Sequence, residues 1–308
     1  PHEALSTATK SKGKFMKTSL LVAGCQFPVE ADIASNLDHI LTQIDQAASQ
    51  GARIVHFSET ALSGYAGVDF PDMTHLQWDQ LEQASKQILQ AAASHKVWVL
   101  LGSTHRLTGD HRPHNSVYII NDCGEIIERY DKRFCTGRLE PECELDLLHY
   151  SPGNHASLFE VDGHRCSVLI CYDYRFPELY RDLKSQGVEV VFQSFHNARR
   201  SQEDHQASNI WESVVPATMV CRAATNHFWI SATNSSTRYS SWGNFFVAPN
   251  GELTGQLPVH DTGILFSTID TEETFWDASE PWRERSIQGQ WHSGELVEDD
   301  RSRNRQSL

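Results

Sequence analysis

The first hundred residues alternate between short apolar runs and amphipathic stretches, and this alternation constrains the fold more than any other feature of the 308-residue chain. Apolar runs predict strands over 20–26, 53–58 and 97–102. Between them, apolar residues at helical spacing predict a helix over 35–50, and a second helix is expected over 76–94. Crossover helices make the strands that they join parallel, and parallel strands are buried on both faces. The segment therefore predicts a β-α-β-α-β unit.

The pattern changes in the second half of the chain. The turn residues at 122–124 separate two apolar runs and those at 162–164 separate two more, so both segments predict hairpins. Further strands are expected over 188–193 and 228–232, with a helix over 205–225 between them. No internal repeat or Ser/Pro-rich linker divides the sequence, which favours one α/β or α+β domain over two.

Charge and cysteine content exclude several classes of protein. Asp and Glu number 40 against 26 Lys and Arg, and the net charge of −14 repels a phosphate backbone, so no nucleic-acid partner is expected. Seven cysteines without a CxxC pair predict free thiols in a reducing compartment, and we expect a cytoplasmic protein. The apolar runs are too short to cross a bilayer, so no membrane partner is expected either.

Two segments are expected to flank the domain. Three lysines precede a short apolar run that ends in Val-Ala-Gly-Cys, as in a lipoprotein signal, but the apolar core over 20–23 is too short for export. We expect Met16 to be the natural start and residues 1–15 to be a flexible leader or an expression remnant. The domain is expected over 16–275, followed by a polar C-terminal tail over 276–308.

Three predicted strands lead directly into a reactive side chain and a loop, and these side chains are Glu59, Lys132 and Cys171. Sheets place ligands at such strand ends. A thiol attacks as thiolate and has an ordinary pKa of about 8.5, so it needs a base and a cation nearby. Glu59 can supply the base, while Lys132 and the backbone amide of Tyr172 can stabilise an oxyanion. Each residue alone has an ordinary structural explanation, and only the combination favours catalysis.

These residues resemble the nitrilase superfamily of carbon–nitrogen hydrolases, whose triad is Glu, Lys and Cys in this chain order. The resemblance covers roughly residues 19–270 and does not rest on one motif. The further matching segments are Cys25-Gln26, Gly64-Tyr65, Tyr130-Asp131, Ser151-Pro152-Gly153, Tyr172 through Glu178, Trp211-Glu212, Ala223 through Asn226, Asn234 and Pro249-Asn250-Gly251.

The resemblance implies a four-layer α-β-β-α sandwich that forms a homodimer or higher homo-oligomer through helices beside the nucleophile and needs no cofactor. It also implies that Cys171 attacks an amide carbonyl, that ammonia or an amine leaves after protonation through Glu59, and that water hydrolyses the thioester. True nitrilases usually have Cys-Trp-Glu, whereas Cys171-Tyr172-Asp173 resembles the amidase and Nit-type branches. We therefore expect an amidase that acts on a small linear amide.

The sequence departs from the family pattern at the second carboxylate. Relatives usually have a glutamate six residues before the proline of the Pro-Gly pair, where it contacts the lysine, and here Asp146 holds that position. Glu140, Glu142 and Glu144 lie nearby. We slightly prefer Asp146, and Glu144 is the alternative if a small insertion changes the register.

Five further side chains are candidate substrate contacts. Arg175 either holds a substrate carboxylate, as in carbamoylase relatives, or forms a structural ion pair at a helix start. Loop position and the resemblance add Tyr65, His196, Asn197 and Trp211. The 16 histidines match no metal-binding spacing, so no metal is expected.

Three alternatives to the amidase remain open from the sequence. An N-carbamoyl or ureido amidohydrolase would use the same triad, and a nitrilase is less favoured. A catalytically silent binding or redox-sensing protein on the same fold is the third, although the intact triad argues against it. The acyl group of the substrate does not follow from the sequence.

Overall fold

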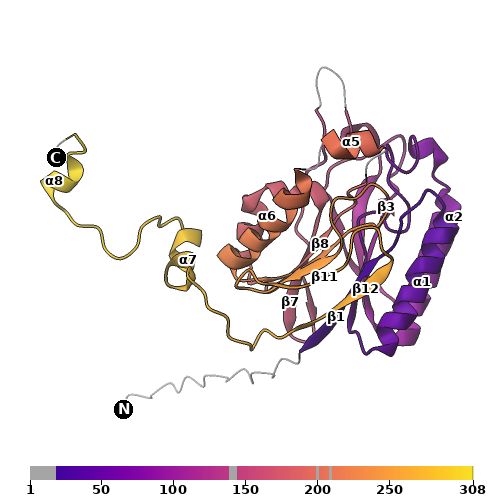
Figure 1. Cartoon of the computed structure of the whole chain (residues 1–308), viewed down its shortest axis with the longest axis horizontal. Coiled ribbons are helices and arrows are strands. Elements are labelled where there is room, and N and C mark those ends of the chain that lie inside the picture. The colour runs from indigo at the N-terminus through magenta and orange to yellow at the C-terminus, as the bar shows by residue number, and fades with distance from the viewer. Residues whose placement is uncertain (1–18, 139–143, 199–200, 208–209, 307) are drawn as a thin grey trace, which may run out of the picture.

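The structure is a computed structural model, and it describes residues 19–138, 144–198, 201–207, 210–306 and 308. Two six-stranded sheets pack face to face, with helices covering their outer faces (Figure 1). This is the expected four-layer α-β-β-α sandwich. The expected leader over 1–15 lies outside the described residues, as do Glu140, Glu142 and Cys143.

The first sheet has the strand order β12-β1-β2-β3-β4-β5. Its strands are β1 (Leu20–Gln26), β2 (Ile54–His56), β3 (Trp98–His105), β4 (His114–Ile120), β5 (Ile126–Asp131) and β12 (Gly263–Ile269). Strands β1, β2 and β3 are parallel to one another, as predicted, and the other pairs in this sheet are antiparallel. Helices α1 (Ile33–Ser49) and α2 (Trp78–His95) make the crossovers and pack on each other outside this sheet (Figure 1).

The second sheet has the strand order β11-β10-β9-β8-β7-β6, with β7, β8 and β9 parallel. Its strands are β6 (Phe159–Val161), β7 (His164–Ile170), β8 (Val190–Ser194), β9 (Trp229–Thr233), β10 (Phe245–Val247) and β11 (Leu253–Gln256). Helices α4 (Pro177–Ser185) and α6 (Trp211–Asn226) pack together on this side. The single helix predicted over 205–225 is wrong, because α5 (Gln202–Ala207) is separate from α6.

Short helical turns occupy several loops. They are η1 (Met73–His75), α3 (Asp146–His149) and η2 (Cys171–Arg175). The C-terminal tail extends away from the sandwich and carries α7 (Glu280–Ile287) and α8 (Asp300–Arg303) (Figure 1). Within the described ranges, none of the helices combines the length and hydrophobicity needed to cross a membrane.

Alternation along the strands produces two separate cores. Ile54 packs in the cluster that includes residues of both sheets, whereas its neighbour Val55 packs in the cluster that includes α1 and α2. Successive side chains of a strand point to opposite faces, so a strand between two apolar layers must be apolar at every position. This is why the central strands appear in the sequence as continuous apolar runs.

A glycine in β3 makes room for the loop that follows β2. A Cβ atom at Gly102 would lie 2.0 Å from the carbonyl oxygen of Ser58 and 2.7 Å from the backbone nitrogen of Thr60. Because both are backbone atoms that flank Glu59, Gly102→Ala should displace this loop and lower the free energy of unfolding by about 1–3 kcal/mol in urea denaturation. The control is Gly263→Ala in β12, whose Cβ would meet only Leu257 at 3.6 Å. Equal stability of the two variants would contradict this account.

Candidate active site

The three predicted catalytic residues converge from both sheets. Glu59 lies in the loop after β2, Lys132 directly follows β5, and Cys171 follows β7. Lys132 Nζ donates a 2.8 Å hydrogen bond to Glu59 Oε1, and the two side chains are 1% and 0% exposed. Lys132 and Cys171 line a pocket of about 460 Å³. A buried ammonium, paired with the carboxylate of Glu59, therefore lies at the wall of a cavity that Cys171 also lines.

Asp146 provides a second carboxylate for Lys132. Its Oδ2 atom accepts from Lys132 Nζ at 2.9 Å, and its Oδ1 atom accepts from the hydroxyl of Tyr65 at 2.6 Å. Burial alone would raise the pKa of Asp146, but the charge of Lys132 and these hydrogen bonds lower it. Burial alone would lower the pKa of Lys132, but Asp146 and Glu59 raise it well above its usual value. Glu144 is exposed, so of the two acids it is Asp146 that contacts the lysine.

The one-turn helix α3 presents this shorter acid to the lysine. Asp146 is its first residue, and the backbone N–H of Thr136 donates to Asp146 Oδ2 at 3.0 Å. The preceding residue, Leu145, has a φ of +50°, which turns the chain sharply into the helix. The loop therefore brings the carboxylate close enough for an aspartate to reach Lys132.

This contact predicts a contrast between two neighbouring acids. Asp146→Asn should reduce kcat/KM roughly 30- to 150-fold, because removing one buried charge-assisted hydrogen bond costs about 2–3 kcal/mol. Glu144→Gln, an equivalent change at an exposed position, is the control and should be nearly silent. Steady-state kinetics on both variants checks this, and equal effects would contradict the assignment.

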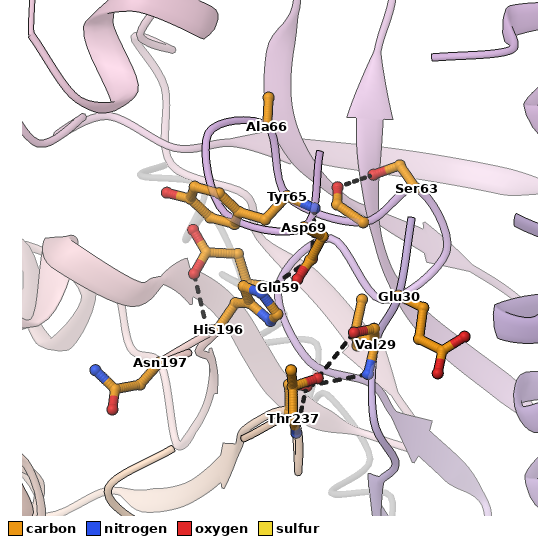
Figure 2. Close-up of polar contacts among 12 residues, drawn as sticks. Val29, Glu30, Glu59, Ser63, Tyr65, Ala66, Asp69, His196, Asn197 and Thr237 are labelled. Carbon is orange, nitrogen blue, oxygen red and sulfur yellow. Dashed lines mark hydrogen bonds and ion pairs between the residues drawn. The ribbon is translucent and has the colours of Figure 1, made fainter. Parts of the chain in front are cut away.

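Glu59 has two further donors that the sequence did not reveal. Asn115 Nδ2 donates to Glu59 Oε1 at 2.7 Å. The backbone N–H of His196 donates to Glu59 Oε2 at 2.9 Å, as Figure 2 shows. Asn115 lies in β4 beside Lys132, whose backbone N–H bonds to the Asn115 carbonyl at 2.9 Å. Only the pairing of β4 with β5 identifies Asn115, since nothing in its local sequence marks it.

Cys171 lies at a sharp turn between β7 and η2. Its φ is +38°, in the left-handed region that residues with a side chain seldom adopt. Asp173 holds the turn, because its carboxylate accepts from Ile170 N at 3.1 Å and from Phe134 N at 2.9 Å. Burial raises the pKa of Asp173 to about 6. The turn is thus tied to the chain segment that follows Lys132.

The surroundings of Cys171 favour the protonated form of its thiol. Burial, and then the charge of Glu59, raise its pKa well above the usual value, and the opposing effect of Lys132 is smaller. A nucleophilic thiolate at this position therefore requires a base that removes the proton during the reaction. Glu59, which is hydrogen-bonded to Lys132, is the carboxylate available for this task.

The pocket contains most of the predicted substrate contacts. Tyr65, Tyr172, His196, Asn197 and Trp211 line it. Arg175 does not line it: the side chain is exposed, and its guanidinium carbon lies 4.8 Å from the ring centroid of Trp211. Within the described ranges Arg175 forms no ion pair, and its contact with a substrate carboxylate stays a prediction.

Several lining residues were missed by the sequence analysis. They are mostly aromatic or apolar and come from four different segments: Tyr174, Phe195, Val215 and Trp242. Such residues look like ordinary core residues in the sequence, so no local signal distinguishes them. In the described part of the chain, no three His, Cys, Asp or Glu side chains are grouped in a way that would hold a metal ion.

Comparison with known proteins identifies the family and supports the fold. The family model described as "Carbon-nitrogen hydrolase" matches residues 21–275. The chain is 28% identical over 230 residues to 2-oxoglutaramate amidase of Bacillus subtilis (strain 168), covering 73% of this chain and 81% of that protein. It is 24% identical to "Omega-amidase NIT2" of Homo sapiens, covering 83% and 90%. The crystal structure of an amidase from Nesterenkonia sp. has a similar fold, with a TM-score of 0.70 at 21% identity over 91% of this chain and 99% of that one.

Proposed function

Because this chain belongs to the carbon–nitrogen hydrolase family, we propose that it hydrolyses the C–N bond of a small carboxamide with Cys171 as nucleophile. In this proposal Glu59 transfers protons and Lys132 stabilises the oxyanion. The observation that carries it is the buried cluster of Lys132 with Glu59 and Asp146, in which Lys132 and Asp146 line the same pocket as Cys171.

The first half-reaction forms a thioester. Glu59 takes the Sγ proton of Cys171 as sulfur attacks the carbonyl carbon, and the carbonyl π electrons move to oxygen. The ammonium of Lys132 stabilises the negative charge on this oxygen. When the tetrahedral adduct collapses, the C–N bond breaks and Glu59 returns its proton to the leaving nitrogen, so ammonia or an amine departs.

The second half-reaction hydrolyses the thioester. Glu59 now takes a proton from water, whose oxygen attacks the acyl carbon. Collapse of this second adduct breaks the C–S bond, releases the carboxylic acid and restores the thiol with the proton held by Glu59. The sum is amide plus water giving acid plus ammonia or amine, with no oxidant or cofactor consumed.

The wall of the pocket favours an acyl group with apolar or aromatic surface. The aromatic side chains of Tyr172, Trp211 and Trp242 line it, and the lysine among its described residues, Lys132, is already paired with two carboxylates. The named relatives include amidases for 2-oxoglutaramate and ω-amides. We therefore propose a monoamide whose acyl group stacks on these rings.

Acid-quenched intact mass spectrometry tests the proposal with a panel of aliphatic, aromatic and ω-carboxylated amides, N-carbamoyl compounds and nitriles. A substrate amide should leave an adduct equal to its mass minus ammonia, and free ammonia should accumulate. Cys171→Ala protein is the control and should carry no adduct. Adducts from N-carbamoyl compounds or nitriles alone would overturn the amidase proposal.

We also propose a cytoplasmic homodimer. The cysteines of the described residues are free thiols, which supports a reducing compartment. Helices α4 and α6 pack together, α6 contacts the nucleophile turn η2, and by the family resemblance we propose the dimer contact there. Sedimentation equilibrium tests the assembly, and a monomer throughout the micromolar range would contradict it.

A further inference from the structure

A buried His–Asp pair lies beside Glu59 and takes no part in the reaction described above. His196 Nε2 lies 3.1 Å from Asp69 Oδ2, and the two side chains are 0% and 6% exposed. Figure 2 shows both residues next to Glu59. Burying an ion pair costs desolvation free energy, which is offset only where further hydrogen bonds and good geometry stabilise the charges. The position of this pair beside a candidate proton-transfer group therefore suggests a function.

The pair is connected to one particular oxygen of Glu59. Lys132 and Asn115 both donate to Oε1, whereas among the described donors only the backbone N–H of His196 reaches Oε2. A second backbone bond runs in the opposite direction, from Glu59 N to Phe195 O at 3.2 Å. The backbone at 195–196 therefore sets the direction of Oε2, the oxygen with capacity left to accept a proton.

The side chain of His196 holds this backbone in place. Its imidazole stacks on the ring of Tyr65, with ring centroids 5.3 Å apart and planes 14° apart. Asp69 Oδ2, which faces the imidazole, also accepts from Tyr65 N at 2.8 Å. Asp69 thus contacts the imidazole of His196 and the backbone of Tyr65, and we expect a change at Asp69 or His196 to alter the position of Glu59 Oε2.

The pair also changes the charge of the site. Glu59 and Asp146 are two carboxylates that pair with the ammonium of Lys132, and Asp69 is a third carboxylate, which faces His196. An imidazolium at His196 offsets part of this excess negative charge. The charged groups that act electrostatically on His196 are Asp69, Glu59 and Lys132. Burial alone would lower the pKa of His196, but Asp69 raises it above the usual value.

We infer that His196, clamped by Asp69, is a positioning residue that aims Glu59 Oε2 and supplies positive charge for proton transfer in the proposed amidase reaction. The inference rests on the proposed function for its reaction and on the geometry above for its residues. The inference gives His196 the role of orienting the base Glu59, whereas the sequence suggested that His196 contacts the substrate.

The His196–Asp69 ion pair predicts the direction in which kcat changes with pH. The ion pair is fully formed below the ordinary pKa of histidine, about 6.5, and is lost as the pH rises through the raised pKa of His196. Burial raises the pKa values of Cys171 and Tyr65, and the charges of Asp146 and Glu59 raise that of Lys132. All three lie well above their usual values, so the first alkaline decline in kcat should belong to His196.

Two variants separate positioning from simple packing. His196→Phe keeps the stacked ring and the backbone N–H but removes the charge, and it should lower kcat roughly tenfold or more with little change in KM. It should also abolish the alkaline decline. Asp69→Asn keeps an acceptor for Tyr65 N and should move the decline to lower pH. The double variant should lose no more than the larger single effect.

The matched control is His75→Phe. His75 forms an exposed pair with Asp72, at 3.3 Å with the side chains 54% and 51% exposed, so kcat and its pH profile should stay as in the wild type. An unchanged alkaline decline in Asp69→Asn, or a higher KM with unchanged kcat in His196→Phe, would overturn the inference. The second result would make His196 a substrate contact.

A readout that needs no turnover distinguishes this inference from the proposed function. Iodoacetamide alkylation of Cys171, located by peptide mass, reports removal of the thiol proton by Glu59. Two results would support positioning even if no amide is hydrolysed. In Asp69→Asn the alkaline change in the alkylation rate should move to lower pH, and in His196→Phe this change should be absent. Identical alkylation profiles in all variants would reject positioning even if amide hydrolysis is found.

Discussion

Cys171→Ala should reduce turnover at least about 10⁴-fold while leaving the thermal unfolding midpoint nearly unchanged. The loss is large because the proposed mechanism forms a covalent bond to this sulfur, and removing a nucleophile eliminates the thioester route. The fold should survive, since the substitution removes one atom from a side chain that lines a cavity. Ammonia release and differential scanning calorimetry on the same preparation measure both quantities.

Cys135→Ala is the matched control. Cys135 is partly buried, and burial raises its pKa to about 12, so it should be inert and its replacement should leave activity within about twofold. Peptide mapping of a trapped acyl-enzyme completes the test. An acyl group on Cys135 or Cys143 instead of Cys171 would show that the nucleophile is misassigned.

Lys132→Arg should lose most of the activity, about 10²- to 10³-fold in kcat, although it conserves charge. The ammonium lies among Glu59 Oε1, Asp146 Oδ2 and the hydroxyl of Tyr65 at 2.8, 2.9 and 3.2 Å. A planar guanidinium cannot place a compact charge at that point without moving these groups. Lys132→Gln should be comparably inactive and less stable by about 3–5 kcal/mol, because two buried carboxylates then lose their cation.

The same substitution at an exposed lysine provides the control. Lys86 pairs with Glu82 at 2.6 Å on the surface of α2, and Lys86→Arg should leave kcat and the free energy of unfolding nearly unchanged. Single-turnover kinetics and urea denaturation compare the variants. Turnover close to wild type in Lys132→Arg would indicate that backbone amides, and not Lys132, stabilise the oxyanion.

The sequence by itself predicted the parallel strand order at the start of the chain. The apolar runs that became β1, β2 and β3 and the amphipathic stretches that became α1 and α2 are local periodic signals, which the burial of strand and helix faces imposes directly. The prediction of one helix over 205–225 was wrong, because the described residues form two helices there, α5 and α6, and Ile210 belongs to neither.

The positions of Glu59, Lys132 and Cys171 at strand ends could also be predicted, although the strands before Glu59 and Lys132 belong to one sheet and the strand before Cys171 belongs to the other. Their catalytic roles remain predictions. The contact between Asp146 and Lys132 depended instead on the one-turn helix α3, whose direction no local pattern specifies.

Only the tertiary structure decided which distant residues complete the site. Asn115 reaches Glu59 through the pairing of β4 with β5, Asp69 reaches His196 from a separate loop, and Arg175 stays outside the pocket. Periodicity reports whether a side chain faces the core or solvent. It carries no information about which side chain of another segment it meets, because that depends on how the two sheets pack and how the loops between their strands turn.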